Sequence, residues 1–304
     1  MRPNRIICSL LIISVLMLAL PLQVNAEEKL TIYTVNYPLY YFSERIGGDH
    51  VKVVLPAPED VDPAFWEPST DTVRQYQRAD LIILNGAGYA KWTRKVSLPM
   101  LRMVDTSRAF KDDLVHIQTN VTHSHGPGGD HSHGGTAFTT WLDFSQAAMQ
   151  AEAVYKALAR KLPAQKQNLT KNFEALKRDL LELDKQMIAV GDRLAQAPLF
   201  ASHPVYQYLA RRYSMNIRMM MWESDEDPGV NAWNHLQEIS KEHPAKWMIW
   251  EGDPLAESAQ QLKAQGINSL VFAPCMNMPG TGDFIGIMRR NIENLQSVFT
   301  TEDH

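Results

Sequence analysis

The sequence has almost no cysteine. Among 304 residues only Cys8 and Cys275 are cysteines, and Cys8 lies in an N-terminal segment that we expect to be removed. One remaining thiol cannot form an intramolecular disulfide, even in an oxidising compartment. Packing must therefore stabilise the fold, and Cys275 is left as an unpaired thiol.

The sequence also lacks a second long apolar run. The one run that it has, residues 6–20, follows two arginines and leads into a short polar stretch that ends at Ala26. About 15 apolar residues are too few for the roughly 20 that span a bilayer, and the pattern is typical of a secretory signal peptide. We expect residues 1–26 to be a signal peptide and the mature protein to be periplasmic, starting at Glu27. An uncleaved membrane anchor is the alternative.

Basic charge and catalytic motifs are scarce as well. The net charge of -4 argues against nucleic acid or an anionic membrane as a partner. The sequence contains no Gly-x-Ser-x-Gly elbow, no His-Glu-x-x-His pair and no Gly-Lys-Ser/Thr phosphate loop. We therefore expect a protein without enzymatic activity. A hydrophobic content of 45% and a charged content of 21% are those of an ordinary globular protein.

Short apolar runs alternate with helix-like segments, and this rhythm occurs twice. Continuous apolar strands separated by helices indicate parallel sheets covered on both faces. The expected strands are residues 30–35, 51–55, 81–84, 101–104, 199–201, 217–221, 247–250 and 269–272. The predicted fold class is α/β, with two lobes that each hold a parallel sheet flanked by helices. We place the N-terminal lobe at residues 27–162 and the C-terminal lobe at 197–304.

One long amphipathic helix is predicted between the lobes, within residues 163–196. Apolar residues recur every three or four positions from Leu169 to Leu194, and Gly191 and Pro198 mark the end of the pattern. About 30 residues at 1.5 Å each span about 45 Å. A coiled coil is the alternative. A rigid helix across both lobes would let them rock slightly rather than close widely.

Residues 116–135 are rich in histidine and glycine. Four of the ten histidines lie between positions 123 and 133, and clustered imidazoles are good ligands for zinc, copper or nickel. We expect a mobile surface loop that captures metal, and a solvated polar loop is the alternative. The candidate ligands are His123, His125, His131 and His133.

Several short motifs, in order along the chain, resemble those of the metal-binding periplasmic solute-binding proteins that deliver zinc or manganese to ABC permeases. The resemblance implies two α/β lobes joined by a long helix, with one metal ion in the cleft between them. The His-rich segment also lies where zinc-specific members carry one. The motifs are Tyr37-Pro38 with residues 46–49, residues 62–68, Ala79-Asp80 with Asn85-Gly86, residues 141–143, residues 203–213 and residues 288–291.

The family typically binds its metal with four side chains, two from each lobe. Only His203 matches at these four positions, and the other three carry Ala64, Thr139 and Ala273. Since zinc needs three or four strong donors, either other side chains complete the shell or the cleft binds something else.

Other donors fall near the expected cleft. Cys275 stands two residues beyond the missing fourth ligand and could coordinate as a thiolate, although a lone cysteine is more often a buried apolar residue. Glu67, Glu251 and Asp283 also fall in loops that the family places near the cleft. The acidic run 223–227 is typical of a solvated face, though it could attract a cation.

The predicted function is that of the substrate-binding component of a metal ABC uptake transporter, with zinc as the transported ion and an inner-membrane permease as partner. We expect a monomer. The alternative is a carrier of another divalent or softer metal, or of a metal chelate or small organic ligand, with the His-rich loop as metal scavenger. The candidate metal residues are His203, Cys275, Glu67, His123, His125, His131 and His133.

Overall fold

The computed structural model describes residues 28–117, 122–125, 129–132 and 135–300. The expected signal peptide and His133 lie outside the described residues. Within the described ranges, no helix combines the length and the apolar character needed to cross a membrane.

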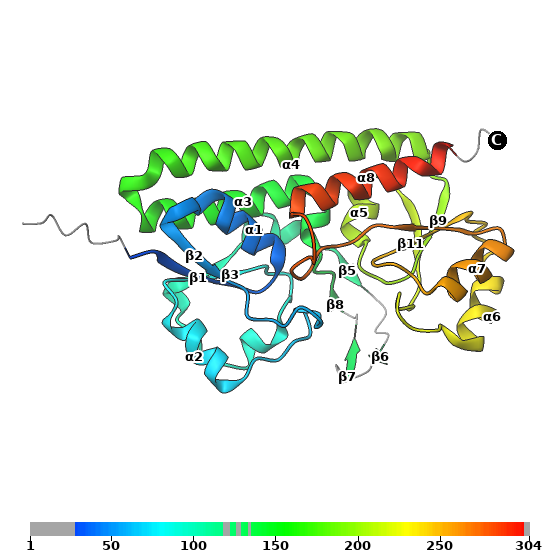
Figure 1. The fold of residues 1–304 in the computed structure, drawn as a ribbon, viewed down its shortest axis with the longest axis horizontal. Helices are drawn as coiled ribbons and strands as arrows, with labels where there is room; N and C mark the ends of the chain where they lie inside the picture. Colours follow the sequence, from blue (N-terminus) through cyan, green and yellow to red (C-terminus); the bar gives the residue numbers. More distant parts are fainter. Residues whose placement is uncertain (1–27, 118–121, 126–128, 133–134, 301–304) are drawn as a thin grey trace, which may run out of the picture.

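The N-terminal lobe is built on a four-stranded parallel sheet with the order β2-β1-β3-β4. Its strands are β1 (Leu30–Thr34), β2 (Val51–Val54), β3 (Leu81–Leu84) and β4 (Met103–Asp105). Its helices are α1 (Tyr37–Gly47), α2 (Thr70–Arg78) and α3 (Phe144–Lys161). Helices α1 and α3 lie on one side of the sheet and α2 on the other (Figure 1). Strand β3 is apolar throughout because helices cover both faces of the sheet.

The C-terminal lobe repeats this plan with a second parallel sheet, in the order β10-β9-β11-β12. Its strands are β9 (Pro198–Ala201), β10 (Asn216–Met219), β11 (Trp247–Trp250) and β12 (Asn268–Val271). Its helices are α5 (Gln207–Arg212), α6 (Gly229–Ile239), α7 (Ala256–Ala264) and α8 (Phe284–Thr300). The prediction of two α/β lobes with parallel sheets is confirmed.

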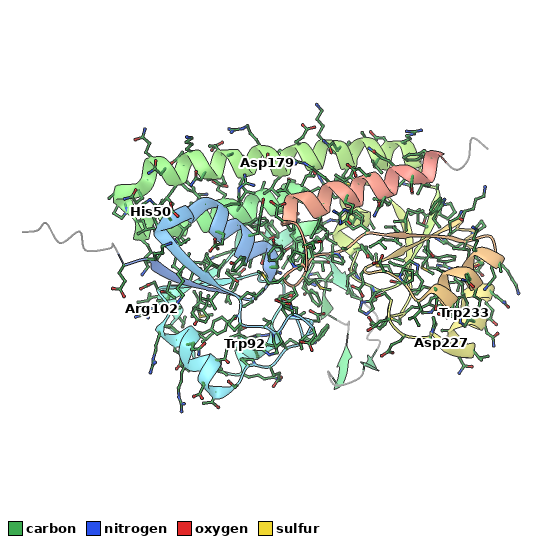
Figure 2. The ribbon with its side chains drawn as sticks, in the orientation of Figure 1. His50, Trp92, Arg102, Asp179, Asp227 and Trp233 are labelled. Atoms are coloured by element: carbon green, nitrogen blue, oxygen red, sulfur yellow. The ribbon has the colours of Figure 1, made fainter. Side chains whose placement is uncertain are left out.

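The long helix predicted between the lobes is α4 (Lys166–Leu194), and it has 29 residues. It runs along one side of the whole molecule, above both lobes (Figure 1). In the N-terminal lobe, Arg45 of α1 pairs with Asp179 of α4 at 2.9 Å, and Figure 2 marks Asp179 near the middle of the helix. In the C-terminal lobe, Arg212 of α5 pairs with Asp184 of α4 at 2.6 Å. Ion pairs thus join α4 to both lobes, and its apolar side chains from Leu169 to Leu194 are buried.

The chain after β12 crosses to the N-terminal lobe, where helix α8 begins before it runs back over the C-terminal lobe (Figure 1). This helix lies beside α4 in Figure 1, and its Phe284 ring packs edge-on against Phe42 of α1 with 5.5 Å between ring centroids. The Tyr41 hydroxyl donates to Asp283 at 3.2 Å. One cluster of buried apolar residues contains members of both lobes, from Ile32 to Val298, and a second cluster around Trp222 and Trp250 lies within the C-terminal lobe. The last part of the 197–304 segment thus packs against the N-terminal lobe as well as its own.

The His-rich segment, predicted from the sequence as a mobile surface loop, contains two short antiparallel ribbons. Strand β5 (His116–Ile117) pairs with β8 (Gly135–Thr136), and β6 (Thr122–His125) pairs with β7 (Gly129–Ser132). Such pairing uses backbone groups, so a composition poor in apolar residues does not prevent it.

Candidate metal centre

Three acidic or imidazole side chains stand at the carboxyl ends of three neighbouring strands. His203 lies just beyond β9, Glu223 just beyond β10, and Glu251 directly follows β11. The N–H of Ser202 donates to the carbonyl of Ile249, and the N–H of Trp222 donates to the carbonyl of Ser202. These bonds extend the sheet by a residue or two and hold the three chain segments together. Ligand sites of open parallel sheets form at this edge.

The three side chains meet in a compact group. The His203 Nδ1 atom lies 2.9 Å from a Glu251 oxygen, and the Nε2 atom lies 3.3 Å from a Glu223 oxygen. One donor atom from each residue falls within 4.8 Å of the others, and this is the one such group of three that the described part of the chain contains. The side chains of His203, Glu223 and Glu251 are 6%, 20% and 14% exposed.

Two carboxylates in a partly buried space favour positive charge. Burial alone would lower the pKa of His203, but a hydrogen bond and charge from Glu251 raise it. Glu223 and Asp62 add to this effect, and the pKa lies above its ordinary value. The second oxygen of Glu251, Oε2, is buried and has no hydrogen-bond partner among the described residues. A divalent cation would satisfy that oxygen and replace the imidazolium proton as the positive charge.

A bound metal requires one change in this arrangement. Each ring nitrogen of His203 faces a different carboxylate, and only one nitrogen can point at a single ion. Histidines that bind metals commonly keep the other N–H on a carboxylate, which orients the ring. One glutamate can therefore remain as the orienting partner while the other turns to the metal, or both can add their second oxygens to the shell.

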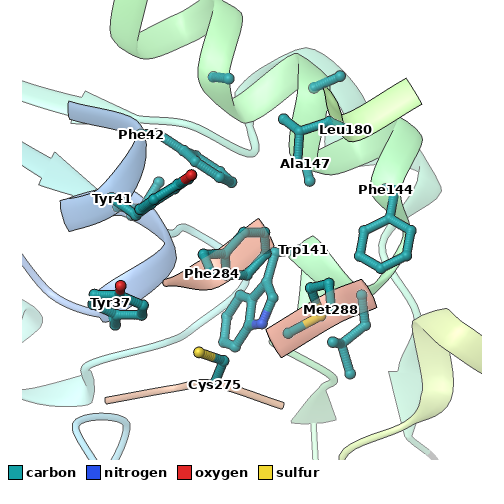
Figure 3. Close-up of a cluster of buried hydrophobic side chains, with 14 of the residues drawn as sticks. Tyr37, Tyr41, Phe42, Trp141, Phe144, Ala147, Leu180, Cys275, Phe284 and Met288 are labelled. Atoms are coloured by element: carbon teal, nitrogen blue, oxygen red, sulfur yellow. The ribbon is translucent and has the colours of Figure 1, made fainter. Parts of the chain in front are cut away.

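Cys275, predicted as a ligand, is not brought to this group. Its side chain is 9% exposed and lies near Tyr37 and Trp141 in an apolar cluster (Figure 3). Burial, and to a smaller degree Asp283, raises the pKa of its thiol to about 12. The neighbouring carbonyls fix this direction, because Pro274 accepts from the Trp141 indole at 2.8 Å and Met276 accepts from the Tyr37 N–H at 3.0 Å.

Glu67 is not brought to the group either. Its side chain is 65% exposed and forms an ion pair with Lys95 on the surface of the N-terminal lobe. Glu67 belongs to the loop between β2 and α2, which was expected to lie near the cleft, but its carboxylate points to solvent and to Lys95.

At the three positions without a family ligand, the residues present are buried or form structural hydrogen bonds. Ala64 is 3% exposed. The Thr139 hydroxyl donates to the carbonyl of Val205, which places it beside the His203 segment. The backbone of Ala273 exchanges two hydrogen bonds with the Asn291 side chain, at 3.0 and 2.8 Å.

The structure describes only part of the predicted His-rich ligand set. The backbone register of β6 and β7 places His123 opposite His131, with His125 opposite Gly129. Ile117 and Gly135, at the two ends of the His-rich segment, line an interlobe cavity of about 380 Å³. Pro204, the residue after His203, lines the same cavity.

The sequence alone predicts neither Glu223 nor Glu251 as a ligand, although Glu251 was expected near the cleft. Glu223 was assigned to an acidic run expected to be solvated, and Asp225 and Asp227 of that run are indeed exposed. The signal that could have separated Glu223 is its distance from the strand end. His203, Glu223 and Glu251 each follow an apolar strand closely, and the ends of parallel strands converge.

Comparisons with known proteins agree with this architecture. The family described as zinc-uptake complex component A, periplasmic, matches residues 32–298. The zinc-binding protein AdcA of Streptococcus pyogenes is 25% identical over 293 residues, 90% of this chain and 57% of that protein. The high-affinity zinc uptake system protein ZnuA of Bacillus subtilis is 24% identical over 289 residues, 88% of this chain and 87% of that protein. The chain thus spans little more than half the length of the AdcA relatives it matches.

Solved structures share the fold. The metal-dependent lipoprotein YcdH of Bacillus subtilis superposes with a TM-score of 0.76 at 22% identity, over 88% of this chain and 99% of that one. Zn(II)-bound AdcA of Streptococcus pneumoniae gives a TM-score of 0.74 at 21% identity, over 89% of this chain and 57% of that one. Because the family match covers nearly the whole described chain, this protein belongs to the family of the periplasmic component A of zinc-uptake complexes.

Proposed function

We propose that this protein captures zinc in the periplasm for an ABC uptake system and holds the ion with His203, Glu223 and Glu251. The observation that carries the proposal is the convergence of these three side chains at the ends of β9, β10 and β11, within 4.8 Å of one another. Imidazole nitrogen and carboxylate oxygen are both ligands that zinc accepts. Relatives named as zinc-binding or zinc-uptake proteins support the choice of ion.

The wider setting is part of the same proposal. Residues 1–26 direct export and are removed, so that the mature protein starts at Glu27 in the periplasm. It acts as a monomer without catalytic activity and delivers its ion to an inner-membrane permease. The soft-metal alternative has less support, because it depended on a thiolate from Cys275, whose thiol lies in an apolar cluster.

The His-rich segment is proposed to gather zinc near the cleft. Its two ends line the interlobe cavity that Pro204, next to His203, also lines. Ions held there at moderate affinity would be close to the tighter site. The proposed ligands are His123, His125, His131 and His133.

The experiment separates the two zinc sites. A variant with all four loop histidines changed to glutamine, hereafter the loop-Gln variant, should bind one zinc ion per chain in competition with a chromophoric chelator. Adding His203→Ala should abolish this tight binding, whereas His235→Ala, which removes an exposed imidazole from α6 of the same lobe, should not. Unchanged tight binding after His203→Ala would refute the proposed site.

A further inference from the structure

The interlobe cavity of about 380 Å³ is distinct from the metal group. Within the described part of the chain, none of His203, Glu223 and Glu251 lines it. Its volume lies at the lower end of the range for pockets that hold small organic molecules, and it is far larger than a single metal ion. The cavity therefore has room for a ligand of another kind.

Apolar side chains from both lobes form part of the cavity wall. Pockets for organic ligands combine such walls with a few polar or charged groups that fix the orientation of the ligand. This wall therefore favours a ligand with an organic body over a bare ion. The apolar residues are Leu114, Ile117 and Phe138 of the N-terminal lobe and Pro204 and Val205 of the C-terminal lobe.

The charged side chains at the cavity all carry positive charge. Lys91 and Arg94 line it, and no carboxylate lines it among the residues that the structure describes. Clefts that are lined by charges of one sign and have walls of low polarity concentrate the opposite charge. The cavity therefore favours an anion, although the whole chain has a net charge of -4.

The segment after β3 places these two cations. It leaves the carboxyl end of that strand, the edge at which open parallel sheets gather their ligands. It then turns at Ala87, Gly88 and Ala90, whose φ angles of 50°, 79° and 51° lie in the left-handed region. The short 3₁₀ helix η2 (Lys91–Arg94) follows and carries the cations as its first and last residues. The turn thus brings both positive charges to the ligand edge of the N-terminal sheet.

Arg94 is the better placed of the two to bind an anion. Its guanidinium lies beside Gly88, since a Cβ built on that glycine would come within 3.9 Å of the Arg94 Nη2 atom. No ion pair with a carboxylate engages Arg94 in the described ranges of the chain, whereas the adjacent Lys95 pairs with Glu67. A guanidinium binds a carboxylate through two parallel hydrogen bonds. Lys91 adds a second positive charge at the same cavity.

We propose that this cavity binds a small organic acid, whose carboxylate pairs with the Arg94 guanidinium while its apolar body lies against Phe138 and Val205. Such a ligand contacts both lobes, because Arg94 and Phe138 belong to the N-terminal lobe and Val205 to the C-terminal lobe. The site is additional to the proposed zinc site and takes the opposite charge. The carboxylates of the metal group attract a cation, and the cavity attracts an anion.

The test is calorimetric titration of adipate and of benzoate into the metal-free loop-Gln variant at neutral pH. In this protein neither a bound metal nor the four loop histidines can hold the acid. Adipamide and benzamide are matched controls, since they keep the shape of the acids without the charge. We expect saturable binding of at least one acid, with one molecule per chain, and no binding of either amide.

Arg94→Gln in the same protein tests the anchor. We expect it to weaken acid binding by at least about 10-fold, the loss expected when a charge-assisted pair is removed. Lys95→Gln is the matched control and should leave acid binding unchanged. It removes a basic side chain from the next residue in sequence, and that side chain pairs with Glu67 on the surface.

Three results would overturn the proposal. The first is that neither acid binds at millimolar concentration, or that an amide binds as tightly as its acid. The second is that Arg94→Gln binds the acids as tightly as the parent. The third is that inorganic phosphate binds more tightly than both acids, because the cavity would then select an oxyanion rather than an organic ligand. Each of these results leaves the proposed zinc site unaffected.

Discussion

The environment of His203 predicts how the metal-free protein responds to its removal. The imidazole lies between two glutamates that keep little contact with water, at 2.9 and 3.3 Å. His203→Ala would leave Glu223 and Glu251 close together without a positive or hydrogen-bonding group between them. We therefore expect the variant to be less stable even when no metal is present.

The magnitude follows from the contacts. Hydrogen bonds to charged groups contribute about 1.5–3 kcal/mol each, and removal of one partner of a buried ion pair costs about 3–5 kcal/mol. The glutamate side chains are 20% and 14% exposed, so water recovers part of this loss. We expect the free energy of unfolding to fall by about 2–4 kcal/mol, which corresponds to a decrease in Tm of about 5–10 °C for a chain of this size.

The assay is urea and thermal unfolding in the presence of EDTA, followed by tryptophan fluorescence, because Trp222 and Trp250 are buried in the same lobe. His243→Ala provides a comparison, because it also removes a buried imidazole from this lobe. The His243 ring forms its hydrogen bond with the carbonyl of Leu199 rather than with a glutamate. Both variants lose stability from the cavity, so the comparison alone does not isolate the charge effect.

The charge effect is isolated by adding Glu251→Gln. In the His203→Ala protein this second change removes one of two adjacent carboxylates, and we expect it to restore about 1 kcal/mol. In the His243→Ala protein the same change should restore nothing. If the double variant with His203→Ala is no more stable than the single variant, the imidazole does not hold the two carboxylates together as argued.

Three further outcomes are expected. Asp184→Asn should lower the free energy of unfolding by about 1–3 kcal/mol, because it weakens the ion pair between the buried Asp184 and Arg212, whose side chain is 35% exposed. Urea unfolding measures this, and Asp192→Asn, exposed on the same helix, should change the free energy of unfolding by less than about 0.5 kcal/mol. Cys275→Ala should leave zinc affinity unchanged. The cobalt-substituted parent protein should show no sulfur-to-metal charge-transfer band, and such a band would contradict the apolar placement of the thiol. Zinc binding beyond one ion per chain should be present at pH 7.5 and lost near pH 5.5, because imidazoles protonate below about pH 6.5; calorimetry at both pH values tests this, and equal binding would exclude histidine as the donor. The loop residues concerned are His123, His125, His131 and His133.

Local patterns in the sequence were enough to predict the architecture. Each expected strand appears in the structure within about two residues of its predicted ends, because strands of a parallel sheet are covered on both faces and therefore carry short apolar runs. The helix between the lobes was predicted just as directly, since the positions that its periodicity marks as apolar, such as Leu169 and Leu180, are fully buried. The position of His203 after a strand also followed from the sequence.

The composition of the site depended on tertiary structure. Glu223 and Glu251 are 28 residues apart in sequence, and nothing in the sequence pairs either of them with the other or with His203. Strand order places β10, β9 and β11 side by side, and this order alone brings their ends to one point. The sequence shows that each residue follows a strand closely, but not which strands are neighbours in the sheet.

Side-chain direction was equally beyond the reach of the sequence. Cys275 lies two residues from an expected ligand position, but two hydrogen bonds from the N-terminal lobe fix the adjacent carbonyls, and its thiol packs in the core. Glu67 faces Lys95, a residue far along the chain. The sequence by itself determined which segments are buried, because burial follows from local apolar patterns. Only the tertiary structure decided which polar side chains meet, because that depends on strand order and on contacts between lobes.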